Sequence, residues 1–270
     1  MRLISQLVLA ATLAFVSPAA ARNVTDHGGN VVEVPDAPQR ILSLHDWTLT
    51  VMTRELDAPL IASAGRLAPD GTTFIRGGRE LFGLNFDQIA LAAIHGKPDL
   101  ERIRSLKPDL IVANIGDYSA LREQLSTIAP TLMFDAENGD KPFDLYRQYA
   151  GWIGRQARFD ALKAAYDKRI TEARQKLPKT LIDGSYSAIL ANERDGTLTM
   201  LKEYGVQTTV LDDLGMSRTA LAQSVPEGQS RMTIGAELIG EIDADLIVTS
   251  YLPESGENPE SIFSALARVA

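Results

Sequence analysis

Two stretches of the chain share one pattern: residues 100–112 read LERIRSLKPDLIV, and residues 236–248 read AELIGEIDADLIV. Each starts with apolar positions at helical spacing and ends in an apolar run typical of a buried strand. The stretches align without a gap, so Glu101 corresponds to Glu237 and Asp109 corresponds to Asp245. A repeat of this kind predicts two related α/β units in one chain.

Strands and helices alternate around the first stretch. Apolar runs at 41–44, 60–64 and 131–134 predict strands, and residues 47–56 and 121–128 predict helices. Strands that are separated by helices indicate βαβ units with mainly parallel sheets. The predicted fold class is therefore α/β, with two Rossmann-like lobes.

A long helical stretch, residues 143–177, lies between the two units. Gly151 and Gly154 predict a break near Gly154, and Pro178 ends the helix. The part after the break is long enough to reach about 30 Å at the rise of an α-helix. We therefore expect an N-terminal lobe (22–154), a single linking helix (155–178) and a C-terminal lobe (179–270) that is cut short at Ala270.

The N-terminus has the pattern of a secretory signal peptide. Arg2 precedes an apolar run to Val16, and small residues follow at 19–21. This run is too short for a membrane-spanning helix. We expect cleavage after Ala21 and a periplasmic protein, and the absence of cysteine predicts that no lipid anchor is attached.

Composition and motifs exclude several classes of function. The net charge is −8, whereas a nucleic-acid partner would require a basic face. The chain contains no phosphate-binding loop, no nucleophile elbow and no HExxH zinc motif. We therefore expect no enzymatic activity and no cofactor.

Several segments resemble the periplasmic ferric-siderophore and cobalamin binding proteins of ABC importers. The resemblance rests on residues 24–35 and 38–41, on 98–113, on 125–131, on the linking helix, on 211–215 and on 237–248. It implies two lobes on one long helix, with a ferric siderophore bound between them. It also implies a membrane permease as partner, and we expect the binding protein to be a monomer.

Candidate ligand-binding residues come from loops that follow predicted strands. Trp47, Tyr118 and Tyr204 are candidate apolar walls, because small-molecule sites are mostly apolar and aromatic. Arg76 and Arg79 flank a Gly-Gly turn. His95 lies nearest to the place where hydroxamate-binding relatives carry a basic residue, so a hydroxamate-like chelate is favoured.

Direct metal binding is the alternative. His45 follows the first predicted strand, and His45, His95 and Tyr118 together would suit a haem iron or zinc. His27 is expected to be exposed in the first turn. No two histidines are closely spaced, so such a site would depend on tertiary contacts.

Glu101 and Glu237 are candidates for permease docking. They occupy equivalent positions in the two copies of the repeat. In the family that the chain resembles, one glutamate on each lobe contacts arginines of the membrane subunits.

Overall fold

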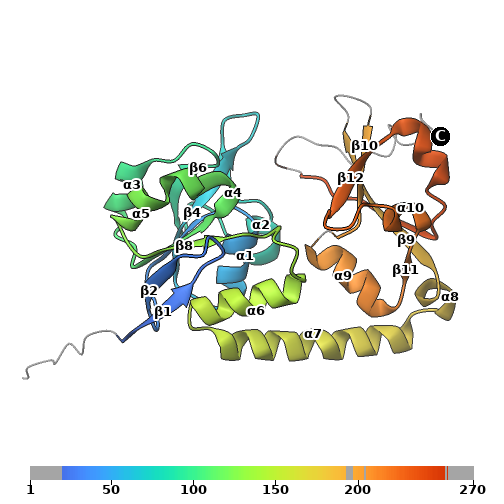
Figure 1. The fold of residues 1–270 in the computed structure, drawn as a ribbon, viewed down its shortest axis with the longest axis horizontal. Coiled ribbons are helices and arrows are strands. Elements are labelled where there is room, and N and C mark those ends of the chain that lie inside the picture. Colours follow the sequence, from blue (N-terminus) through green and yellow to red (C-terminus); the bar gives the residue numbers. More distant parts are fainter. Residues whose placement is uncertain (1–19, 193–196, 204, 253, 255–270) are drawn as a thin grey trace, which may run out of the picture.

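Two α/β lobes lie side by side along one long helix, α7 (Gln156–Lys176), which runs beneath both of them (Figure 1). The computed structural model describes residues 20–192, 197–203, 205–252 and 254. Helix α7 has 21 residues and lies within the stretch 155–178 where a linking helix was predicted. None of the helices in these ranges is long and apolar enough to cross a membrane.

The sheet of the first lobe is parallel except at one edge. Strands β4 (Leu60–Leu67), β3 (Ile41–Leu44), β7 (Leu110–Asn114) and β8 (Thr131–Phe134) follow one another in space, and β6 (Ala90–Ile94) pairs with β4. Only the short β5 (Thr73–Phe74) pairs antiparallel, at the far end of β4. The chain first forms β4, β5 and β6 on one side of β3, and then crosses to the other side to form β7 and β8. Ligands of parallel α/β sheets bind at the carboxyl ends of strands where the order reverses in this way.

Helices cover both faces of this sheet (Figure 1). One face packs on α1 (Thr48–Glu55) and α6 (Pro142–Trp152), with a core that includes Ile41, Val112 and Phe159. The core of the other face includes Ile111 and Ile103. The shorter helices of this lobe are α2 (Gly78–Phe82), α3 (Leu100–Ser105), α4 (Ile115–Tyr118), η1 (Ser119–Leu121) and α5 (Arg122–Ser126).

An antiparallel hairpin, β1 (Ala21–Thr25) and β2 (Val31–Pro35), precedes the sheet, over the first of the segments on which the resemblance rests. Its turn residue His27 is half-buried, so the expectation that it is simply exposed was wrong. The Nδ1 atom accepts the backbone N–H of Asp135 at 2.9 Å, and Nε2 lies 2.8 Å from the side-chain oxygen of Gln148. The ring also contacts Phe134 and Trp152. His27 therefore fastens the hairpin to the lobe.

The second lobe is built around β9 (Ser185–Asn192). This strand pairs parallel with β11 (Ser217–Arg218) and β13 (Leu246–Val248), as expected of a Rossmann-like lobe. It pairs antiparallel with β10 (Thr197–Leu201), which in turn pairs antiparallel with β12 (Arg231–Gly235). The lobe also contains α8 (Lys179–Ile182), α9 (Gly205–Leu214), α10 (Ala220–Gln223) and η2 (Ala236–Glu241).

The repeated aspartates do the same structural work in both lobes. Asp109, just before β7, accepts the backbone N–H groups of Gln39 and Arg40 at 2.7 and 2.8 Å, at the start of the neighbouring β3. Asp245, just before β13, accepts the N–H of Ser185 at 2.7 Å and its hydroxyl at 3.0 Å, at the start of β9. These hydrogen bonds hold the pKa of Asp245 below its usual range. The two copies of the repeat therefore share a structural role as well as a sequence pattern.

Replacing Asp109 with alanine should destabilise the protein by about 1–3 kcal/mol, because two backbone N–H groups lose a charged acceptor. Urea denaturation would measure this change. Asp160→Ala is the matched control, since that exposed carboxylate accepts one hydrogen bond from the Gln156 side chain. Equal stability of the two variants would contradict the role given to Asp109.

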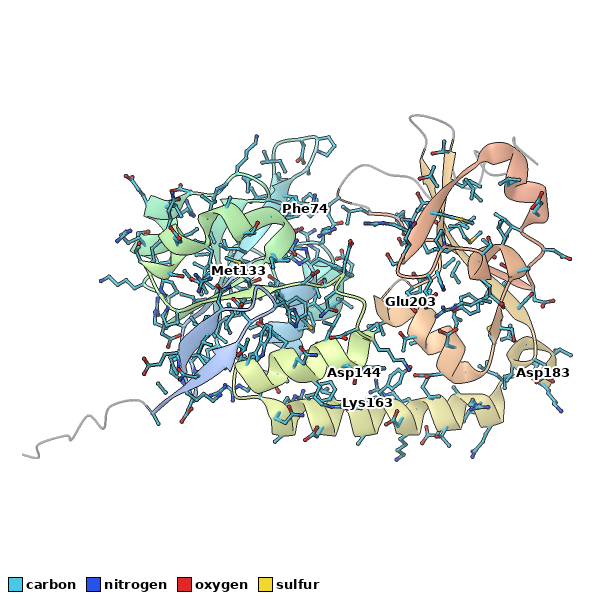
Figure 2. The ribbon with its side chains drawn as sticks, viewed as in Figure 1. Phe74, Met133, Asp144, Lys163, Asp183 and Glu203 are labelled. Atoms are coloured by element: carbon cyan, nitrogen blue, oxygen red, sulfur yellow. The ribbon has the colours of Figure 1, made fainter. Side chains whose placement is uncertain are left out.

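Side chains connect the lobes near α7. The Tyr166 hydroxyl of α7 donates to Asp213 of α9 at 2.7 Å, while its ring contacts Phe143 of α6. A second contact between the lobes is a 3.1 Å ion pair between Arg231 of β12 and Glu137 of the first lobe. In Figure 2, Phe74 and Glu203 lie on the sides of the two lobes that face each other.

Candidate functional site

Polar residues gather at the carboxyl ends of the strands of the first lobe. His45 and Asp46 follow β3, Arg66 lies near the end of β4, His95 follows β6, and Asp117 lies in α4 directly after β7. Parallel strands bring these ends to one edge of the sheet. The cluster therefore occupies the position where ligands bind in this type of sheet.

A buried carboxylate organises the cluster. Asp46 is fully buried, and one of its oxygens, Oδ2, accepts the Nε–H of Arg66 at 2.9 Å and the Nε–H of Arg76 at 3.0 Å. The other oxygen, Oδ1, lies 3.3 Å from Nη2 of Arg76 and 3.7 Å from Nδ1 of His95. Both arginine side chains remain partly exposed. Burying an anion requires such partners, so Asp46 and the arginines fix one another.

The two predicted histidines are close together. Their ring centroids are 6.2 Å apart, and Nε2 of His95 lies 3.9 Å from a carboxylate oxygen of Asp117. Burial, and after it the positive charge of Arg76, lower the pKa of His45 to about 4, although Asp46 and Asp117 act in the opposite direction. His45 is therefore neutral at neutral pH.

This shift predicts a pH-dependent loss of stability. Because the pKa of His45 lies below the value of about 6.5 for an unfolded histidine, acid favours the unfolded chain between these two values. Between pH 7 and pH 4.5 the wild type should lose roughly 2 kcal/mol more than His45→Gln. Urea denaturation of both proteins at each pH tests this. Parallel pH profiles would show that His45 is not held neutral.

Trp47 provides an exposed aromatic surface beside the arginines. Its side chain is 43% exposed, and its ring lies against Gly77, next to Arg76. Gly77 has φ of +62°, and a Cβ atom there would lie 2.5 Å from the indole, so only glycine fits beneath this ring. Leu81 also packs there and is 53% exposed. Arg79, the other predicted arginine of this loop, is exposed on α2.

Tyr118 lies below the surface instead of on it. The side chain is fully buried in the core beneath the cluster, and its hydroxyl makes no side-chain hydrogen bond within the described residues. Burial raises the pKa of this phenol to about 12. Tyr204, the third predicted wall, lies outside the described residues.

Asp46, Arg66 and Asp117 were missed by sequence reasoning. Asp46 stands next to two predicted site residues, His45 and Trp47, so its position carried a usable signal. The indication for Arg66 was weaker, because its strand was expected to end at Ala64. Among the described residues, no group of three or more His, Cys, Asp or Glu side chains is arranged to hold a metal ion.

The predicted docking residues lie at the starts of the repeated segments. Glu101 is exposed in the first turn of α3. Glu237 lies in η2, which has 3-10 geometry where a helix was predicted, and its side chain is outside the described part of the structure.

A family model described as "Periplasmic binding protein" matches residues 81–264, more than half of the chain. The chain belongs to this family. The match includes both copies of the repeat and the linking helix. A family of binding proteins agrees with the expectation that the chain is not an enzyme.

Relatives and solved structures support the same placement. The ferric enterobactin-binding periplasmic protein FepB of Escherichia coli is 28% identical over 236 residues, which cover 85% of this chain and 72% of FepB. The chain spans about half the length of the Bacillus subtilis relatives it matches, among them the Fe(3+)-citrate-binding protein YfmC and the iron(3+)-hydroxamate-binding protein FhuD.

Staphylococcus aureus SirA complexed with staphyloferrin B has the same fold, with a TM-score of 0.70 and 21% identity over 92% of this chain and 82% of SirA. This likeness confirms the two-lobed α/β fold. None of these relatives is named as a haem or zinc carrier, so the alternative that uses His45, His95 and Tyr118 gains no support.

Proposed function

We propose that this protein is the substrate-binding component of an ABC importer and that it delivers a ferric siderophore to a membrane permease. The chelate binds at the carboxyl ends of the first lobe's strands, on Trp47, Arg66 and Arg76, with the second lobe facing it. The iron is bound through the chelate, so the protein supplies complementary walls and no metal ligands.

The observation that carries this proposal is the pairing of an exposed indole with two anchored guanidinium groups. A site for a bulky organic complex needs apolar surface and a few fixed polar groups. Trp47 supplies the first and the Asp46 cluster supplies the second. The names of FepB, YfmC and FhuD add support, because each describes a carrier of chelated iron.

The remaining parts of the proposal concern export and organisation. The protein is exported, with the signal peptide cleaved after Ala21, and it acts as a periplasmic monomer. Its lobes are residues 22–154 and 179–270, joined by residues 155–178. The lengths of α6 and α7 and the interrupting Gly154 support these boundaries.

Replacing His45 and His95 together with alanine separates chelate binding from direct metal binding. If the iron arrives chelated, affinity for the chelate should fall by roughly tenfold at most for each histidine, and so by about a hundredfold at most for the pair, since each side chain offers one hydrogen bond. Fluorescence titration of the variant measures this. Collapse of affinity, or stoichiometric haem or zinc in the purified wild type, would contradict the proposed function.

A further inference from the structure

The bonds within the Asp46 cluster leave a defined set of donors unused. Arg66 contacts Asp46 through Nε alone, so within the described residues both of its terminal nitrogens are without a hydrogen-bond partner. Arg76 uses Nε and Nη2, which leaves Nη1. The two side chains are 31% and 26% exposed. A row of N–H donors is therefore held at the surface by a carboxylate beneath it.

The charges of the cluster favour an anion on this side. Both guanidinium groups are always ionised, and the single charge of Asp46 compensates only one of them. His45 is neutral at neutral pH. Within the described residues the carboxylate of Asp117 forms no ion pair with either arginine, and it lies 3.9 Å from Nε2 of His95, whereas Asp46 lies near Nδ1 of the same ring. Uncompensated positive charge therefore remains on the exposed arginine side.

Two neighbouring guanidinium groups repel each other unless an anion lies between them. Asp46 provides this anion. Its Oδ2 atom accepts the Nε–H groups of both arginines and so fixes the orientation of the two planar guanidinium groups. Arginine forks match carboxylate and similar oxyanions in geometry, whereas lysine acts as a point charge. The arrangement is thus organised before any ligand arrives.

We propose that Asp46 is a positioning residue of the ligand site: it holds the guanidinium groups of Arg66 and Arg76 in a fixed orientation before a ligand binds. This arrangement adapts the site to anionic ferric chelates. This inference rests on the proposed function and names its substrate class. It differs from the hydroxamate preference suggested by the position of His95, because two guanidinium charges that a single carboxylate compensates favour a negatively charged ligand over an uncharged hydroxamate complex.

Three probes of different charge test the proposal: a ferric tris-catecholate, ferric citrate and uncharged ferrichrome. Each is titrated into the purified protein while tryptophan fluorescence is recorded. Arg66→Gln and Arg76→Gln should each weaken binding of the tris-catecholate by about tenfold to a hundredfold, the range for loss of a charged hydrogen bond. Binding of ferrichrome should change by less than about threefold. Arg104→Gln, which makes the same change of charge on exposed α3, should alter neither.

The sign of the Asp46→Asn effect distinguishes positioning from simple charge. If Asp46 only contributes negative charge, its removal should strengthen anion binding; if it positions the arginines, tris-catecholate affinity should fall by about tenfold. Arg66→Lys keeps the positive charge but loses the planar guanidinium group, so it should also weaken binding of the tris-catecholate. If a thermal melt shows that Asp46→Asn does not fold, the Arg66→Gln, Arg76→Gln and Arg66→Lys variants test the proposal in its place.

The outcomes separate the two claims. Stronger anion binding by Asp46→Asn, full affinity of Arg66→Lys, or a wild-type preference for ferrichrome would overturn this inference and leave the proposed function standing. Failure of the wild type to bind any of the three probes would overturn the proposed function itself.

Discussion

Uptake of a radiolabelled ferric chelate should fall by at least tenfold when Glu101 and Glu237 are both replaced with alanine, while chelate affinity and folding stay nearly unchanged. One acid per lobe would fix both the position and the orientation of the protein on the permease, and loss of a buried partner in a charged contact costs roughly 2–5 kcal/mol. Glu101 is exposed on α3. We expect Glu237, at the equivalent position of the repeat, to play the matching role.

A matched control is available in the same regions. Glu123 on α5 and Glu241 at the end of η2 are also exposed acids, so their double alanine variant changes the charge equally and should support normal uptake. Exchanging the charges, with Glu→Arg here and Arg→Glu in the permease, should recover part of the lost uptake. Full uptake by the first variant would remove Glu101 and Glu237 from docking.

Gly154→Ala should destabilise the protein by roughly 2–4 kcal/mol, which combines the strain of a left-handed backbone with a steric clash. Gly154 lies in the turn between α6 and α7 with φ of +71°, and a Cβ atom there would lie 2.2 Å from the carbonyl oxygen of Asp36. Arg22 closes the same corner by donating to the carbonyl groups of Gly151 and Trp152, both at 2.8 Å. The substitution would therefore disturb the junction that directs α7 towards the second lobe.

Gly151→Ala is the control for this prediction. Gly151 lies inside α6, and the nearest atom to its Cβ position is 3.6 Å away. Alanine is the better helix former there, so the variant should be as stable as the wild type or more stable by up to about 1 kcal/mol. Urea denaturation of both variants decides the matter, and a Gly154→Ala protein of wild-type stability would contradict the account of the junction.

The features that were predictable from sequence are those set by local pattern. The repeat around Asp109 and Asp245 indicated two lobes, and the apolar spacing up to Pro178 gave the linking helix. The antiparallel pairing of β9 with β10 was missed, although the Asp195-Gly196 pair that separates them is a hairpin signal. The connection between these strands is too short for parallel pairing.

The site was less predictable because tertiary contacts assemble it. Asp46, Arg66 and Arg76 come from three segments and meet only when β3, β4 and the loop before α2 are packed together. Nothing local marks Tyr118 as buried, since an aromatic residue at the end of a short helix suits either core or surface. His27 looked like an ordinary turn residue because its partners Asp135 and Gln148 are distant in sequence.

The most direct test of the central claim is a fluorescence titration of the purified protein with ferric and iron-free siderophores. The chain has two tryptophans, of which Trp47 is exposed beside the arginines and Trp152 is buried. We predict saturable one-to-one quenching by a ferric chelate, retained in Trp152→Phe and lost in Trp47→Phe. Absence of quenching by every ferric chelate, or equal quenching of Trp47→Phe, would contradict a siderophore site at the ends of these strands.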